Sequence, residues 1–193
     1  MIRPISPQDV PAVVAMVHEL ATYERAPEEC HLTEAQLHAA LFGPTPALFG
    51  HVAVDLAVDL AVDAARDPEP VGFALWFLNF STWRGGHGIY LEDLYVRPQA
   101  RGTGLGRALL ATLARICVDR GYGRLDWSVL DWNTPARDVY GALGAAPVAA
   151  WIPYRLDGEA LVRMAQTHPG PTPEAAIPSA GPGTGSPPDP QPS

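Results

Sequence analysis

The chain contains no lysine, and all thirteen of its basic residues are arginines. A lysine Schiff base with a carbonyl substrate and a P-loop lysine on a phosphate are therefore both excluded. The 21 acidic residues outnumber the 13 basic ones, which gives a formal net charge of −8. This excess argues against nucleic acid as a partner, because most of that affinity comes from basic side chains on phosphates.

Cysteines are few, and long apolar runs are missing. Cys30 and Cys117 form no disulfide framework, and neither they nor the six histidines show the spacing of metal ligands. No run of 18 apolar residues occurs, and the first residues, MIRPISPQDV, do not resemble a signal peptide. We therefore expect a cytoplasmic protein with no metal cofactor and no membrane as partner.

The last 26 residues have little apolar surface to bury. Nine of the 21 prolines lie in residues 168–193, which contain no aromatic residue. Such a composition cannot offset the entropy of ordering, so it predicts a disordered tail. One folded domain is expected over residues 1–167.

Two helix starts stand out near the N-terminus. Ser6 precedes Pro7 and Asp9, and valines and Leu20 then recur at helical spacing. A capping box runs from Thr33 to Gln36, ahead of a second apolar face.

The rest of the chain mixes strand and helix patterns. A short tandem repeat, DLAVDLAVDAARDPEP at 55–70, is interpreted as a lengthened connection between two strands. The order of elements predicts the α/β class, with helices packed on one twisted sheet. Strands are expected at 49–54, 71–80, 89–96, 124–130 and 151–156, and further helices at 105–118 and 134–143.

A glycine-rich segment, Arg101 to Gly106 (RGTGLG), follows a strand and opens a helix. Glycines permit positive φ, and the free N–H groups at a helix start bind anions such as a pyrophosphate. From the glycines alone, a purely structural turn is the alternative. A dinucleotide-binding turn is disfavoured, because the G-x-G-x-x-G pattern requires glycine at 107, which is arginine.

The pattern Arg-x-x-Gly-x-Gly at Arg101, Gly104 and Gly106 resembles the acyl-CoA signature of the GCN5-related N-acetyltransferases, the GNAT family. Further segments resemble its diamine and thialysine N-acetyltransferase branch, and the similarity covers most of residues 1–165. The resemblance implies the GNAT fold, with a mixed twisted sheet, helices on both faces and a splayed cleft for acetyl-CoA. The further segments are YLEDLYV at 90–96, STW at 81–83, VLDWN at 129–133 and DVYGALGA at 138–145.

Acetyl transfer to an amine requires a proton acceptor, because an alkylammonium has a pKa near 10. Glu92 and Asp93 are neighbours in an otherwise apolar strand, and strand alternation predicts that only one of them faces the cleft. By resemblance, Glu92 contacts the substrate amine as the base, and Asp93 attracts cationic substrates at a bulge in the strand. Two ordinary strand-edge acids are the alternative.

The resemblance also assigns the acid and the acetyl-CoA contacts. Tyr140 matches the group that protonates the departing CoA thiolate, although its helical spacing alone favours a core residue. A backbone N–H near Leu94 is expected to hold the oxyanion. Arg101 and Arg107 either neutralise phosphates or are solvated charges at the helix start, and Asn133 is expected both to cap a helix and to contact pantetheine. The full set of expected acetyl-CoA contacts is Leu94, Tyr95, Val96, Arg101, Gly102, Thr103, Gly104, Leu105, Gly106, Arg107 and Asn133.

The amine site is expected to contain Trp83, through its ring face, together with Glu92, Asp93 and the acidic loop residues Glu24, Glu28 and Glu29, through their charge. Ser81-Thr82 and the segment Ala149 to Pro153 stand where spermidine-acetylating relatives carry acids. We therefore expect a lysine-like amine, such as thialysine, or a short diamine rather than a long polyamine.

These observations predict an N-acetyltransferase in which a small primary amine attacks acetyl-CoA directly in a ternary complex. Two alternatives are a CoA-binding regulatory protein that has lost turnover and a peptide or protein N-acetyltransferase of the same fold. A homodimer is expected by resemblance only.

Overall fold

The computed structural model describes residues 1–54 and 69–167. The chain forms two compact units, Met1–Leu130 and a second that begins at Asp131. Most of the DLAV repeat and the whole expected tail lie outside the described residues.

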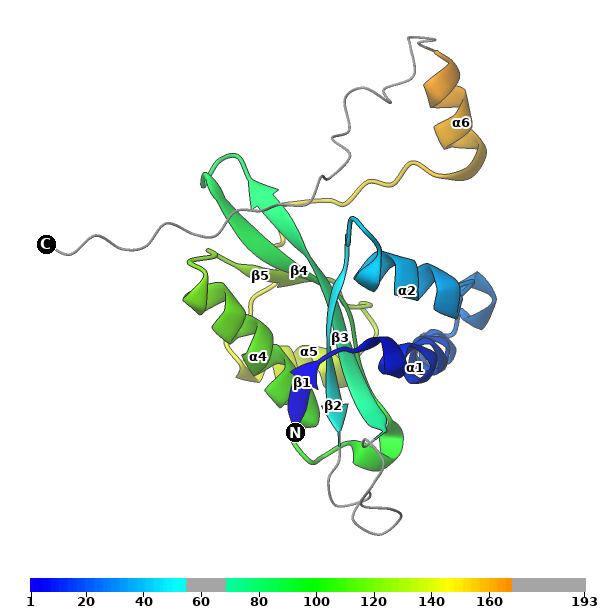
Figure 1. Cartoon of the computed structure of the whole chain (residues 1–193). Helices are drawn as coiled ribbons and strands as arrows, with labels where there is room; N and C mark the ends of the chain where they lie inside the picture. The colour runs from blue at the N-terminus through cyan, green and yellow to red at the C-terminus, as the bar shows by residue number, and fades with distance from the viewer. Residues whose placement is uncertain (55–68, 168–193) are drawn as a thin grey trace, which may run out of the picture. The chain divides into compact units, whose positions relative to one another are not determined.

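The first unit is built on a five-stranded sheet with the order β1-β2-β3-β4-β5 (Figure 1). The first four strands are antiparallel to their neighbours, and β5 is parallel to β4, so the sheet is mixed as predicted. The edge strand β1 has only three residues and was not expected, and β5 is shorter than the strand expected at 124–130. The strands are β1 (Ile2–Pro4), β2 (Phe49–Val54), β3 (Pro70–Ser81), β4 (Gly86–Val96) and β5 (Leu125–Trp127).

Helices cover both faces of this sheet, with α1 and α2 on one face and α4 on the other (Figure 1). The core beneath α1 and α2 contains Phe73 and Leu75 of β3 and Tyr95 of β4. The helices are α1 (Val10–Tyr23), α2 (Glu34–Phe42) and α4 (Leu105–Asp119), with short 3-10 turns at Pro7–Asp9, Pro27–Glu29 and Pro98–Ala100.

Both expected helix starts are present. The Ser6 N–H donates to the Asp9 carboxylate at 2.7 Å, and a one-turn 3-10 helix leads from there into α1. At the second start, the Thr33 hydroxyl accepts from the Gln36 N–H at 3.3 Å, while the Gln36 side chain accepts from the Thr33 N–H at 2.9 Å. These reciprocal bonds satisfy donors that the first helical turn leaves open.

The second unit contains α5 (Thr134–Ala142) and α6 (Gly158–Gln166). The strand predicted at 151–156 is wrong: this segment is irregular, and no strand occurs in the described part of this unit. Pro153 has no N–H to give to a ladder, which explains why the apolar pattern alone misled. Nowhere in residues 1–54 and 69–167 is a helix both long and apolar enough to cross a membrane.

Candidate functional site

Strand β4 continues beyond its parallel partner β5. The two strands pair only from Ile89 with Leu125 to Leu91 with Trp127. The Arg97 N–H donates to the Val71 carbonyl on β3 at 2.9 Å. Because successive backbone groups point to opposite edges, those of Leu94 and Val96 face away from β3, on the edge that β5 has left. This edge suits an extended ligand that pairs as an added strand.

A β-bulge lies at the point where the strands part. Leu91 pairs with Trp76 and Asp93 pairs with Leu75, so Glu92 stands between them with no partner on β3. Bulges bend a strand and redirect side chains, and they are frequent next to active sites.

The bulge corrects the prediction that Glu92 and Asp93 must face opposite sides. Under strict alternation, Leu91 and Asp93 would share a face. Instead, Asp93 is paired with Leu75, which packs in the core under α1 and α2, whereas Leu91 is paired with Trp76, which lies towards α4. The alternation is broken at Glu92, so the two carboxylates are not forced apart.

Asp93 lies in a strongly acidic environment. Its pKa is raised to about 6 by burial first, and then by the negative charges of Glu92 and Glu24. Burial also raises the pKa of Glu24, which directly follows α1. The structure therefore brings together three of the predicted amine-site residues. The neighbouring Glu28 and Glu29 are exposed, and neither contributes to the shift.

The glycine turn opens α4 with its backbone amides free of helix bonds. Gly102 has φ 79° and Gly104, the N-cap, has φ 84°, values that glycine adopts without steric strain. The first bond into the helix runs from the Ala108 N–H to the Gly104 carbonyl, so the N–H groups of residues 105–107 precede it. Open space lies next to Gly104, because a Cβ placed there would meet nothing within 4 Å. These features fit an anion at the helix start.

The turn adjoins the open edge of β4. A Cβ on Gly106 would lie 3.9 Å from the side chain of Leu94 and 3.8 Å from that of Val96. The Thr103 hydroxyl donates to the Ala100 carbonyl at 2.7 Å and so holds the turn from within. An anion bound at the turn and an extended chain paired with β4 would therefore lie next to each other and could be two parts of one ligand.

The two arginines that flank the turn differ. Both are exposed, but Arg107 lies in the first turn of α4, whereas the Arg101 Nε donates to the Val96 carbonyl at 2.9 Å. Arg101 is therefore not a freely solvated charge. Nothing in the sequence indicated this contact, because it depends on how the chain folds back after β4.

Trp83 lies apart from the acidic residues. It sits in the turn between β3 and β4 and is 88% exposed. The start of β4 at Gly86 and the bulge at Glu92 are roughly 20 Å apart along the strand, at about 3.4 Å per residue. Within one chain, the structure does not bring Trp83 to the other predicted amine-site residues.

Asn133 and Tyr140 belong to the second unit. The Asn133 Oδ1 accepts from the Ala136 N–H at 3.3 Å and caps α5, as predicted for this residue. Tyr140 lies on the same helix and is half-buried. Since no residue of α5 is fully buried, its apolar spacing does not mark a core position.

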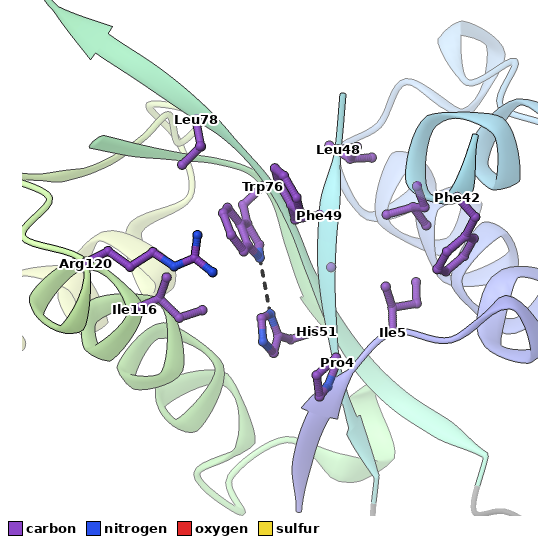
Figure 2. A pocket seen from close by; sticks show the side chains of 12 residues that line it. Pro4, Ile5, Phe42, Leu48, Phe49, His51, Trp76, Leu78, Ile116 and Arg120 are labelled. Carbon is purple, nitrogen blue, oxygen red and sulfur yellow. Dashed lines mark hydrogen bonds between the residues drawn. The ribbon is translucent and has the colours of Figure 1, made fainter. Parts of the chain in front are cut away.

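A separate hollow of about 310 Å³ lies beside β2, lined mainly by apolar side chains (Figure 2). There the Trp76 Nε1 donates to the His51 Nδ1 at 3.2 Å, and the Trp76 ring stacks on Phe49 at 4.7 Å. Burial lowers the pKa of His51, which favours the neutral ring that accepts this bond. None of the predicted site residues lines this hollow.

The first unit thus offers three features: an unpaired strand edge, a turn with free backbone amides, and a group of acidic side chains of which Glu24 and Asp93 are half-buried and Glu92 is exposed. A thioester carried by a phosphate-bearing chain suits the first two, and an alkylammonium suits the third.

Comparison with known proteins agrees with this chemistry. Residues 17–145 match the family model described as the Acetyltransferase (GNAT) family. A thialysine N-epsilon-acetyltransferase from Bos taurus is 37% identical over 168 residues, covering 86% of this chain and 96% of the relative. An L-ornithine N5-acetyltransferase from Arabidopsis thaliana is 30% identical over 194 residues, covering 83% of this chain and 85% of the relative.

Solved structures show the same fold. An integron cassette protein from the mobile metagenome of V. cholerae superposes with a TM-score of 0.68 at 25% identity, covering 86% of this chain and 97% of that one. The family match covers well over half of the chain, and the curated relatives align along nearly their whole length. The chain therefore belongs to the GNAT family and is an acetyltransferase.

Proposed function

We propose that this acetyltransferase moves an acetyl group from acetyl-CoA to the primary amine of a small cationic substrate, such as a lysine-like amino acid or a short diamine. The observation that carries the proposal is the group of Glu24, Glu92 and Asp93 beside the open edge of β4. Relatives named for thialysine and L-ornithine, both amino acids with a side-chain amine, support this substrate class.

The open edge and the glycine turn fit acetyl-CoA, which supplies the acyl group as a thioester. In the proposal, backbone groups of Leu94 and Val96 pair with the pantetheine arm, and Asn133 contacts the same arm. The Leu94 N–H holds the oxyanion of the tetrahedral intermediate. The amides of residues 102–107 take the pyrophosphate, assisted by Arg107.

The acidic residues have two tasks, attracting the ammonium and removing its proton. Glu92 is proposed as the proton acceptor, directly or through water. The raised pKa of Asp93, about 6, makes this carboxylate a second candidate. A base whose pKa lies closer to the working pH is the better acceptor at neutral pH.

The acetyl step then balances as follows. The neutral amine attacks the thioester carbon, the carbon–sulfur bond breaks as the intermediate collapses, and the sulfur receives a proton from the Tyr140 hydroxyl. The first proton of the ammonium leaves through the carboxylate before the attack, and the nitrogen gives up its second proton to solvent as the amide forms. Solvent returns a proton to Tyr140, so one proton is released for each acetyl group transferred. No metal enters any step of this proposal.

We further propose a cytoplasmic homodimer that needs neither nucleic acid nor a membrane, folded over residues 1–167. Apolar side chains in the second unit support a protein interface. Trp151 is 68% exposed, Ile152 75% and Tyr154 93%, and apolar side chains exposed to this degree often mark interaction surfaces.

An amine panel with acetyl-CoA tests the proposal, with release of free CoA thiol as the signal. Thialysine, lysine, ornithine and putrescine should be acetylated, with higher kcat/KM than spermidine or spermine. A lysine-containing peptide is the control for the protein-acetyltransferase alternative. Acetylation of the peptide with no turnover of any small amine would overturn the proposed substrate class.

A further inference from the structure

The side chain of Arg101 is held at three places in the first unit. Its Nε donates to the Val96 carbonyl at 2.9 Å, and its guanidinium carbon lies 5.1 Å from the ring centre of Tyr23 and 5.4 Å from that of Tyr95. Both ring distances lie within the range of cation–π attraction. The guanidinium therefore links the last residue of α1 to the C-terminal end of β4 at Tyr95 and Val96, the acyl end of this strand.

The contact of Arg101 with Tyr23 also bears on the acidic site, because a single peptide bond joins Tyr23 to Glu24. Glu24 follows Tyr23 directly, and its charge contributes to the raised pKa of Asp93. Any movement of the last turn of α1 would therefore change the distance between these two carboxylates. The position of Glu24 depends on what holds Tyr23.

A second tie holds the same helix one turn earlier. The Arg97 Nε donates to the Glu19 carboxylate at 3.2 Å, and a hydrogen bond to Glu19 helps raise the pKa of Tyr95, after burial and the charge of Glu19. The Glu19 contact lies one turn before the contact of Arg101 with Tyr23. The two arginines after β4 thus fasten successive turns of α1 to the strand.

Arg107 is a natural contrast. It flanks the same glycine turn, but across the described residues its side chain makes no hydrogen bond, ion pair or ring contact, and it is exposed at the start of α4. Its charge is available to a phosphate, whereas the guanidinium of Arg101 is already engaged.

We propose that Arg101 is a positioning residue for the amine site: it fixes the end of α1, and with it Glu24, against the acyl end of β4. This inference rests on the proposed function. It assigns the two arginines of the turn to different substrates, Arg101 to the amine through Tyr23 and Glu24, and Arg107 to acetyl-CoA.

The test compares Arg101→Gln with Arg107→Gln, using thialysine, or whichever panel amine gives the highest kcat/KM. Arg101→Gln should raise the KM of the amine about tenfold, which corresponds to about 1.4 kcal/mol, and change the KM of acetyl-CoA less than about threefold. Arg107→Gln should show the reverse. Direct titration of each variant with CoA should show tight binding for Arg101→Gln, which a misfolded variant would not retain.

Tyr23 provides a second pair of variants. Tyr23→Leu removes the ring and should raise the KM of the amine as Arg101→Gln does, whereas Tyr23→Phe retains the ring face and should restore most of the wild-type value. Combining Arg101→Gln with Tyr23→Leu should add little to either single change, because both break the same bridge.

Three results would contradict the inference: a rise in the KM of acetyl-CoA alone for Arg101→Gln, no change in either KM, or full additivity with Tyr23→Leu. In each case the wild-type enzyme would still acetylate the amine. Absence of small-amine acetylation by the wild type would contradict the proposed function instead, so the two failures are distinguishable.

Discussion

Asp9 and Asp93 are two carboxylates withdrawn from water in the same unit, and their pKa values are shifted in opposite directions. Burial alone would raise the pKa of Asp9, but Arg3 donates two hydrogen bonds to it, at 2.6 and 2.8 Å, and the hydroxyl and N–H of Ser6 donate two more, so the pKa is lowered. The same burial raises the pKa of Asp93, and there the charges of Glu92 and Glu24 add to the effect.

The difference separates an acid that is paired within its own chain from one that we propose acts on the substrate. Asp9 receives its donors from its own chain and stabilises the start of α1 in its charged form. Asp93 lies among other acids, so its charged form is costly until a cation arrives. Four measurements test the roles assigned to these acids and to their catalytic partner.

The largest effect is expected at Tyr140, the proposed proton donor, because the carboxylates cannot take over the protonation of the departing thiolate. Tyr140→Phe removes one hydroxyl and keeps the ring, so kcat should fall about 100-fold, at the lower end of what a positioned acid contributes. Both KM values should stay near those of the wild type, as measured by steady-state kinetics. Retention of more than about half of wild-type kcat would make Tyr140 a packing residue.

The next effect concerns attraction of the amine. Asp93→Asn should raise the KM of the amine about 30-fold, equivalent to about 2 kcal/mol, because a charge-assisted contact is lost. In the wild type the same KM should rise as the pH falls through about 6, since protonated Asp93 no longer attracts a cation. The variant should lack this pH dependence; a parallel profile would assign the titration to another group.

Proton removal should show a smaller effect that depends on pH. Glu92→Gln should lower kcat/KM for the amine about tenfold at neutral pH, a loss within the range for a general base. The defect should shrink towards pH 10, where more of the amine is already neutral in solution. If Asp93→Asn is rescued at high pH and Glu92→Gln is not, Asp93 is the proton acceptor.

The smallest effect is a pair of stability changes with opposite signs. Charged Asp93 opposes folding, and this cost appears as the pH rises from the ordinary value of 3.8 through about 6. Asp93→Asn should therefore raise the free energy of unfolding at pH 8 by about 1 kcal/mol, because burial of the amide offsets part of the gain. The gain should vanish below about pH 4.

Asp9→Asn is the matched control for that measurement. Its folded-state pKa is lowered, so its contribution is present above the ordinary value and lost as the pH falls through the folded one. The variant should lose about 1 kcal/mol or more at pH 8, by urea unfolding, with kcat per folded molecule unchanged. A loss of stability in both variants at pH 8 would remove the distinction between the two acids.

Residue types and their spacing predicted most elements, because caps and apolar periodicity are local. The box at Thr33 and Gln36, the strand at Phe49–Val54 and the helix after Gly104 appear where they were expected. The edge strand at Ile2–Pro4 was missed, because three residues carry no period. The strand expected at 151–156 was wrong, since an apolar pattern does not show that Pro153 interrupts pairing.

The acidic residues of the candidate site could be named from the sequence, but their arrangement could not. The sequence placed Glu92 and Asp93 together, but a bulge depends on how β3 and β4 pair, which neither strand reveals alone. The engagement of Arg101 likewise depends on Tyr23, a residue 78 positions earlier whose ring the fold brings within 5.1 Å. Trp83 was grouped with the acids by residue type, whereas its place at the tip of a long hairpin separates them.

The bulge at Glu92 also changes which backbone groups of β4 point towards the β5 side. Before it, the Ile89 N–H points at β5 and bonds the Arg124 carbonyl at 3.1 Å; after it, the even-numbered residues 94 and 96 present their groups to that side. If β4 ran through this point without the bulge, Glu92 would pair with Leu75, odd-numbered amides would face that edge, and each following side chain would turn to the opposite face. The set of amides on the proposed acyl edge is therefore a property of parity, which the one extra residue at Glu92 decides.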